Sequence, residues 1–331
     1  ATFINVPMER SPTRMTRFNN NEQGVGVISM IGIFPLLAAL LLSITLIIIM
    51  KFHGSTPPAY TVPSVLPDTV PSVLPDTVPS VLPGSKMCDT TIKYNLHDSL
   101  PSEWTDEFKL IMINLKRHFP SDNYHSRVCD YTLYAWNSDA NQPYGDISGA
   151  SVSGDKIILE IPSAELTNQL WHRYSVIAHE YYHVYQLARS GGARCKWIME
   201  GPAACFESLY INEYYNVNYF DQQKQLTDDV LTSPAEYESY EKMEVNYSNS
   251  VFMTLVLHKE LVAKGDSVTT AFSKIFKEYW ATNLQDDWKT PFHNVFGFTV
   301  DEFYSMLSNY QLDIDSVLLD SYPSISDYAH K

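Results

Sequence analysis

Two histidines and a glutamate carry the strongest chemical signal in this sequence. His179, Glu180 and His183 stand in the run AHEYYH, which is an HExxH pattern. On a helix, a spacing of four residues places both imidazoles on one face, one turn apart, where they can bind one Zn²⁺ ion. Glu180 lies beside them, in position to act as a base toward water on the metal. The pattern arises by chance in only about one or two per cent of chains of this length, so it predicts a metal site.

A third metal ligand has to come from outside this helix. A third histidine in the pattern HExxHxxGxxH would require glycine at position 186 and histidine at 189, but the chain has Gln186 and Arg189. His172 would lie about 16 Å from His183 along the helix axis, too far for both to bind one zinc ion at about 2 Å. We therefore expect His172 to pack or to face solvent. The expected third ligand is a carboxylate on a second helix, and the candidate is Glu200 in the run KWIMEGPA.

The two segments together resemble a known family. HEYYHVYQ followed by WIMEGPAACFE is similar to the zinc segments of the gluzincin metallopeptidases, in particular the small peptidase-MA-like group with its HExxHxxQ and WxxEGxAxxxE segments. The resemblance implies that His179, His183 and Glu200 bind zinc and that Glu180 is the general base. It also offers Glu207 as an acceptor that orients a ligating imidazole. The alternative for Glu207 is a solvated carboxylate on the helix surface.

A proline close to Glu200 departs from the family pattern. Pro202 stands where this family usually has a larger apolar residue. Because only the first four N–H groups of a helix lack an intrahelical partner, a proline here predicts that the helix begins near Trp197 or Ile198. Glu200 would then lie in the first turn.

The resemblance continues more loosely toward the C-terminus. The segment YSNSVF, which begins at Tyr247, is similar to a tyrosine-led helix in gluzincins, whose tyrosine donates its hydroxyl to the developing oxyanion. Tyr247 is therefore the expected donor rather than a packing residue, with Tyr237 and Tyr240 as rivals among 22 tyrosines. The run FHNVFGFT resembles the closing FGxT segment of the family. Its Thr299 also predicts a capping box with Glu302.

Residues 147 to 161 occupy the place where gluzincins carry an edge strand that pairs with the substrate backbone. No GxMEN segment occurs there, so nothing in the sequence supports an acidic anchor for a free substrate amine. The resemblance therefore favours an endopeptidase over an aminopeptidase.

The elements that must position these residues predict an α+β domain over residues 86–331. Apolar residues at helical spacing predict a helix between Trp104 and Phe119, and residues 131–136 and 156–161 have the pattern of strands. A further helical pattern runs from residue 168 to 189 and ends at two glycines. The resemblance implies a gluzincin-like metallopeptidase domain with an N-terminal mixed sheet and a mostly helical C-terminal part.

The first fifty residues predict a membrane anchor. Residues 25–50 contain no charge and are long enough to cross a hydrocarbon core of about 30 Å as one helix. The run is longer than the apolar part of a cleaved signal peptide, so we expect a signal anchor. Three arginines precede the span and a single lysine follows it, which predicts that residues 1–24 are cytoplasmic and that the rest of the chain is extracytoplasmic, at the cell surface or its equivalent.

A repeat separates this anchor from the domain. Residues 51–85 contain TVPSVLPD, TVPSVLPD and TVPSVLPG, with two prolines in each copy. Such spacing predicts an extended, polyproline-II-like stalk, because each proline also drives the preceding residue toward extended conformations. A ligand for a proline-recognition module is the alternative, and the serines and threonines are candidate O-glycosylation sites.

Four cysteines lie on the exported side of the anchor, where disulfides are permitted. The expected pairs are Cys88 with Cys129 and Cys195 with Cys205, and free thiols are the alternative. The one N-glycosylation sequon begins at Asn246 and overlaps Tyr247. A glycan there would crowd the cleft, so the sequon is unused or the tyrosine is assigned wrongly.

The charge of the chain excludes one class of partner. Lys and Arg number 23 against 38 Asp and Glu, a formal net charge of −15, so a nucleic acid would be repelled. The sequence predicts a membrane-anchored, zinc-dependent peptidase that acts on a peptide or protein substrate. The alternative is a catalytically inactive, stalked surface domain for binding or adhesion. The presence of both histidines, the base and the third carboxylate favours the enzyme.

Overall fold

The computed structural model describes residues 86–240 and 247–329. The predicted membrane span (25–50), the predicted stalk (51–85) and Asn246 of the sequon lie outside these residues. Among the helices that are described, none is both long enough and apolar enough to cross a membrane.

A four-stranded mixed sheet forms the N-terminal part, as predicted. Its strand order is β2-β4-β6-β5. Strands β2 (Thr91–Leu96), β4 (Asp130–Asn137) and β6 (Lys156–Ile161) are parallel, and β5 (Ala150–Ser153) pairs antiparallel to β6 at the edge. The strands expected at 131–136 and 156–161 are therefore confirmed. A small second sheet pairs β1 (Cys88–Asp89) with β3 (Asp122–Asn123).

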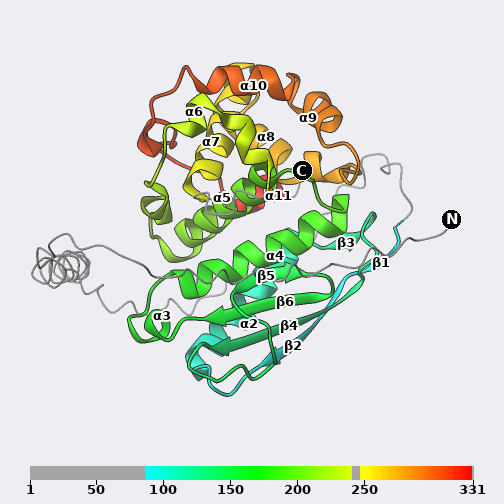
Figure 1. The fold of residues 1–331 in the computed structure, drawn as a ribbon, viewed down its shortest axis with the longest axis vertical. Coiled ribbons are helices and arrows are strands. Elements are labelled where there is room, and N and C mark those ends of the chain that lie inside the picture. The colour runs from blue at the N-terminus through cyan, green and yellow to red at the C-terminus, as the bar shows by residue number, and fades with distance from the viewer. Residues whose placement is uncertain (1–85, 241–246, 330–331) are drawn as a thin grey trace, which may run out of the picture. The chain divides into compact units, whose positions relative to one another are not determined.

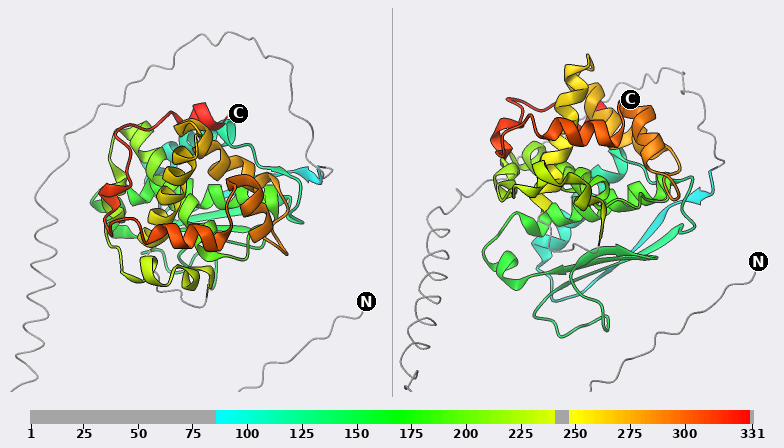
Figure 2. Two further views of the ribbon diagram at one scale, coloured as in Figure 1. Left: turned by 90° about the horizontal axis from the view of Figure 1, so that it is seen from above. Right: turned by 45° about the horizontal axis from the view of Figure 1, so that its top comes forward.

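Two long helices connect the sheet to the rest of the domain. α2 (Ser102–His118) packs against α4 (His172–Ser190), and α4 also contacts β5 and β6. The apolar face of α2 is buried because Trp104, Phe108 and Leu115 recur at helical spacing. α4 lies between the sheet on one side and the C-terminal helices on the other (Figures 1 and 2). Its burial on both sides explains why nearly all of its residues are inaccessible.

The C-terminal part is mostly helical, as predicted. α5 (Lys196–Tyr215) packs between α4 and α7 (Tyr247–Ala263). The shorter α-helices are α3 (Ser163–Thr167), α6 (Asp229–Thr232), α8 (Val268–Ser273), α9 (Lys289–Phe296), α10 (Val300–Leu307) and α11 (Ile325–Ala329). The remaining single turns are η1 (Tyr219–Gln223), η2 (Pro234–Glu238), η3 (Lys274–Glu278), η4 (Tyr279–Ala281) and η5 (Ile314–Ser316).

The ends of three helices follow from local sequence signals. α4 ends where Gly191 adopts a left-handed conformation with φ of 75°, which glycine accepts at no steric cost. α10 begins with the predicted capping box between Thr299 and Glu302. α5 begins at Lys196, slightly earlier than expected, so Glu200 lies just beyond the first turn instead of within it. Pro202 lies inside this helix and has no N–H for the carbonyl of Ile198.

One of the two predicted disulfides is present. Cys88 and Cys129 are joined, which ties β1 to the start of β4. The pairing of Cys195 with Cys205 is wrong, because both are buried free thiols. Cys195 caps α5 and Cys205 lies within it, so about 15 Å of helix separates them, well beyond the reach of a disulfide.

The buried imidazole of His258 should make the stability of the domain depend on pH. It is 1% exposed in α7, its Nε2 lies 3.1 Å from the carbonyl oxygen of Val268, and burial lowers its pKa from 6.5 to about 4. The unfolded chain therefore takes up this proton first as the pH falls. The stabilisation from the neutral ring is complete above about pH 6.5 and is lost on the way to pH 4, which amounts to about 3 kcal/mol.

Urea unfolding at pH 7 and pH 4.5 tests this expectation in wild type and His258→Phe. The substitution should cost stability at pH 7, but the loss between the two pH values should be smaller than in wild type by about 2 to 3 kcal/mol. An equal loss in both proteins would contradict a buried neutral histidine at this position.

Candidate metal centre

α4 presents His179 and His183 on one face, one turn apart. Both imidazoles are buried, with exposed fractions of 8% and 9%, and their Nε2 atoms lie 3.1 Å from each other. The rings are nearly perpendicular. This is the arrangement that the four-residue spacing requires, and it directs one nitrogen of each ring toward a common point.

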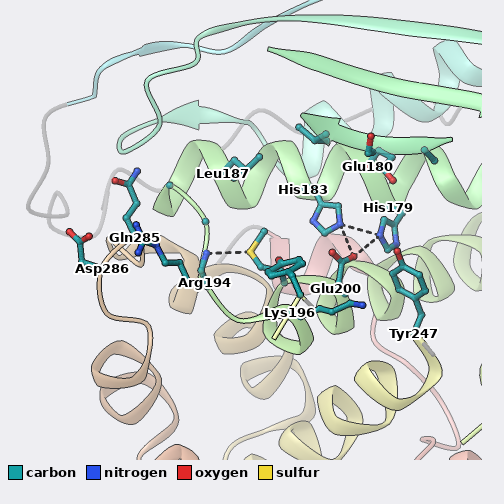
Figure 3. A pocket seen from close by; sticks show the side chains of 18 residues that line it. His179, Glu180, His183, Leu187, Arg194, Lys196, Glu200, Tyr247, Gln285 and Asp286 are labelled. Atoms are coloured by element: carbon teal, nitrogen blue, oxygen red, sulfur yellow. Dashed lines mark hydrogen bonds and ion pairs between the residues drawn. The ribbon is translucent and has the colours of Figure 1, made fainter. Parts of the chain in front are cut away.

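Glu200 reaches the same point from α5. Its Oε2 lies 3.4 Å from Nε2 of His179 and 3.2 Å from Nε2 of His183. The three candidate ligand atoms all lie within 4.8 Å of one another, and no other such group of three occurs in the part of the chain that the structure describes. Figure 3 shows the three side chains pointing toward one another from the two helices. This group can therefore hold a metal ion.

The charges around this point favour a cation. Burial opposes a charge on His179, but contacts with Glu200 and Glu207 outweigh it and raise the pKa of this histidine well above its usual value. Burial likewise opposes ionisation of Glu200, yet hydrogen bonds from both imidazoles hold the pKa of this carboxyl far below its usual value. The carboxylates of Glu200 and Glu207 thus stabilise a positive charge at this point.

Glu180 lies beside the histidines and is almost completely buried. It is 4% exposed, and burial raises the pKa of its carboxyl. Its Oε2 is buried and has no hydrogen-bond partner among the described residues. A buried acceptor without a partner is costly, so its presence next to a potential metal site points to a polar species that binds there.

Glu207 supports His179 from behind. It lies two turns after Glu200 on α5, is 7% exposed, and places its Oε2 3.5 Å from Nδ1 of His179. Of the two interpretations that the sequence allowed, the solvated carboxylate is therefore wrong and the contact with a candidate ligand is present. Such outer partners fix the orientation of a ligating imidazole.

Gln186 has a corresponding place next to His183, and the sequence reasoning gave it no role. Its side chain is fully buried, its Oε1 lies 2.7 Å from Nδ1 of His183, and its Nε2 donates to the carbonyl of Met199 at 3.0 Å. The signal that could have revealed it is a polar residue three positions after His183, because positions i and i+3 share a helix face.

Tyr247 begins α7 and faces the same centre. Its ring lies edge-to-face against His179, with 5.8 Å between the ring centroids, and half of its surface is exposed. Partial burial, followed by the nearby carboxylates, raises its pKa to about 12, so the hydroxyl keeps its proton. Tyr240 also lines the cavity, whereas the hydroxyl of Tyr237 is bound by Asn249 away from it.

His172 takes no part in the centre. As the spacing predicted, it lies outside the cluster, where its Nδ1 contacts Glu165 of α3 at 2.8 Å.

A glycine lets α7 approach closely enough to present Tyr247. A Cβ atom at Gly201 would lie 2.3 Å from the carbonyl oxygen of Ser250 and 2.5 Å from Oγ1 of Thr254. Any side chain at this position would therefore push α7 away from α5. The residue immediately after Glu200 thus sets the distance between the helix that carries the third ligand and the helix that begins with Tyr247.

A cavity of about 650 Å³ opens over these side chains. Residues 150–152 of the edge strand β5 and the His179 face of α4 line it. Figure 3 shows Tyr247 at one end and Arg194, Gln285 and Asp286 at the other, beyond Leu187. The candidate metal centre therefore lies in an open, elongated cleft and not at the bottom of a closed cavity.

No family model matches this chain, and no curated protein matches its sequence.

Proposed function

We propose that this protein is a zinc-dependent peptidase of the gluzincin type that hydrolyses peptide bonds within extended substrates. The observation that carries the proposal is the convergence of His179, His183 and Glu200 from two helices, with the buried carboxylate of Glu180 alongside. A helix bearing HExxH and a glutamate from a second helix together make the zinc site and the base of this chemistry.

The residues present fit zinc. Two imidazoles and one carboxylate are a usual ligand set for catalytic zinc, which leaves a fourth position for water or substrate. Glu180, whose buried Oε2 has no hydrogen-bond partner among the described residues, is one of the residues that line the same cavity. When bound, zinc would supply the electrostatic activation of a water molecule and of the scissile carbonyl.

Glu180 is the proposed general base. Its place next to His179 puts a carboxylate within the cavity, where it can take a proton from the attacking water and pass it to the leaving amine. Burial raises the pKa of this carboxyl. A raised pKa makes the carboxylate a stronger base toward the attacking water.

Tyr247 is the proposed donor to the developing oxyanion. Its hydroxyl is protonated at neutral pH, and its ring is held against His179 at the edge of the centre. A fixed donor directed at developing charge lowers the barrier because it needs no reorganisation. Tyr240 lies near Glu200 and is the remaining rival for this role.

The edge strand β5 supports the binding of an extended peptide. The N–H of Glu160 donates to the carbonyl of Gly149, so these two residues form a hydrogen-bonded pair. Hydrogen-bonded and non-hydrogen-bonded pairs alternate along an antiparallel ladder. The N–H and C=O groups of Ala150 and Val152 therefore point away from β6. These groups border the cavity, where a substrate strand can pair with them. Because the sequence offers no acidic anchor for a free substrate amine and the edge strand lines the cavity, we favour an endopeptidase.

The proposal includes the location predicted by the sequence. Residues 1–24 are cytoplasmic, residues 25–50 anchor the chain as a single span, and the stalk of residues 51–85 carries the domain on the extracytoplasmic side. Zinc and a peptide or protein substrate are its partners. The alternative, an inactive binding or adhesion domain, accounts less well for four chemically matched residues brought together in one buried cluster.

Peptide hydrolysis by the full chain, purified in detergent, tests the function. The zinc-loaded protein should cleave an unfolded protein substrate carrying a quenched fluorophore, lose this activity with a zinc chelator, and regain it with added zinc. A mock preparation, purified in parallel from cells that lack the protein, shows whether contaminating peptidases contribute to the activity. A folded, zinc-loaded chain that cleaves nothing across a mixed peptide library would favour the binding domain.

A further inference from the structure

A single buried side chain connects the two helices that carry the candidate ligands. Gln186 is on α4, is fully buried, and lies three residues after His183. Its amide oxygen lies 2.7 Å from Nδ1 of His183, and its amide nitrogen donates to the carbonyl of Met199 at 3.0 Å. Met199 immediately precedes Glu200 on α5. The amide group thus bridges one candidate ligand to the backbone next to another.

The carbonyl of Met199 determines which way this amide faces. A carbonyl oxygen can only accept, so it requires the –NH₂ group of Gln186 and leaves the amide oxygen for His183. An amide oxygen can also only accept, so Nδ1 of His183 must carry the proton. In the neutral ring that metal binding requires, the lone pair is therefore on Nε2, which points toward Glu200. A metal ion bound there would take the place of the proton that Nε2 shares with Glu200.

We propose that Gln186 is a positioning residue that selects the tautomer and orientation of His183 and aligns it with the turn bearing Glu200. This inference rests on the proposed zinc site. The backbone of Met199 orients the amide, the amide orients the imidazole, and the imidazole presents Nε2. Among the described residues the amide of Gln186 makes these two directed contacts, and both would be lost together if the amide were removed.

The two candidate histidines are supported by groups of different charge. Nδ1 of His179 lies 3.5 Å from the carboxylate of Glu207, whereas Nδ1 of His183 contacts the neutral amide of Gln186. Glu180, Glu200 and Glu207 already bring three carboxyl groups to this buried region. A fourth would be costly so close to the others, while an amide orients the ring without adding charge.

Zinc affinity separates this role from ordinary packing. Gln186→Met keeps a side chain of similar length but cannot accept from His183 or donate to Met199, and we expect the dissociation constant for zinc to rise about 10- to 100-fold. The matched control is Tyr182→Phe, on the same helix and equally buried, which loses a hydroxyl bond to the carbonyl of Phe276. The control should lower the melting temperature but leave zinc affinity unchanged.

The measurement uses the full chain in detergent, with zinc competed against a chromophoric chelator and the melting temperature of the metal-free protein recorded alongside. Wild-type zinc affinity in folded Gln186→Met would overturn the inference and leave the zinc site standing. No zinc binding by wild type would overturn both.

Nitrogen-15 NMR of the zinc-loaded wild type tests the same inference without any variant. His183 should show a slowly exchanging proton on Nδ1. A metal-bound or rapidly exchanging Nδ1 would contradict it.

Discussion

Replacing Glu180 by glutamine is expected to lower peptide hydrolysis by about 10²- to 10⁴-fold while one zinc ion stays bound. The amide has nearly the same shape as the carboxyl group but cannot accept the proton of the attacking water. Glu180 is not among the three candidate ligands, so metal affinity should be retained. Initial rates on a quenched protein substrate and zinc content by elemental analysis, measured on the same samples, test both parts.

Glu165→Gln is the matched control for this change. Glu165 lies on α3, contacts His172, and does not line the cavity, so the same chemical substitution there should leave the rate near that of wild type. If Glu180→Gln kept wild-type activity with zinc bound, Glu180 would not be the base.

Glu200→Ala is expected to lose zinc while the domain remains folded. The substitution removes the single carboxylate of the ligand group and leaves two imidazoles, one protein ligand fewer than catalytic zinc sites use. Because even the outer partners of ligands contribute about 10- to 100-fold to metal affinity, the loss of a ligand should exceed about 100-fold. Zinc content after dialysis against a weak chelator measures this loss, with circular dichroism to establish that the chain is folded.

Glu103→Ala is the control for Glu200→Ala. Glu103 is exposed in the first turn of α2, far along the chain from the cluster, and its loss should leave one zinc per chain. Full zinc occupancy in Glu200→Ala would mean that the third ligand is another residue, and the account of the site would have to change.

Local signals made much of the fold predictable. Strands β4 and β6, the helix carrying HExxH and the capping box at Thr299 all arise from short stretches of sequence, and the structure contains each of them. The cluster of His179, His183 and Glu200 was also predictable in its composition, because HExxH fixes two side chains on one face and the resemblance pointed to the third.

Contacts between distant elements were not predictable from such signals. The pairing of Cys195 with Cys205 failed because the segment between them is helical from Lys196 onward, which keeps the two thiols apart. The close approach of α7 to Gly201 depends on how three helices pack. The same holds for Gln186, whose partner on α5 is a backbone carbonyl that carries no sequence signature.

X-ray absorption at the zinc edge of the purified full chain measures how many atoms bind the metal, of which elements and at what distance. We expect about one zinc per chain, bound only by nitrogen and oxygen at about 2.0 to 2.2 Å, with the scattering pattern of two imidazoles. A folded chain without zinc, or zinc with sulfur ligands at about 2.3 Å, would contradict a centre built from His179, His183 and Glu200.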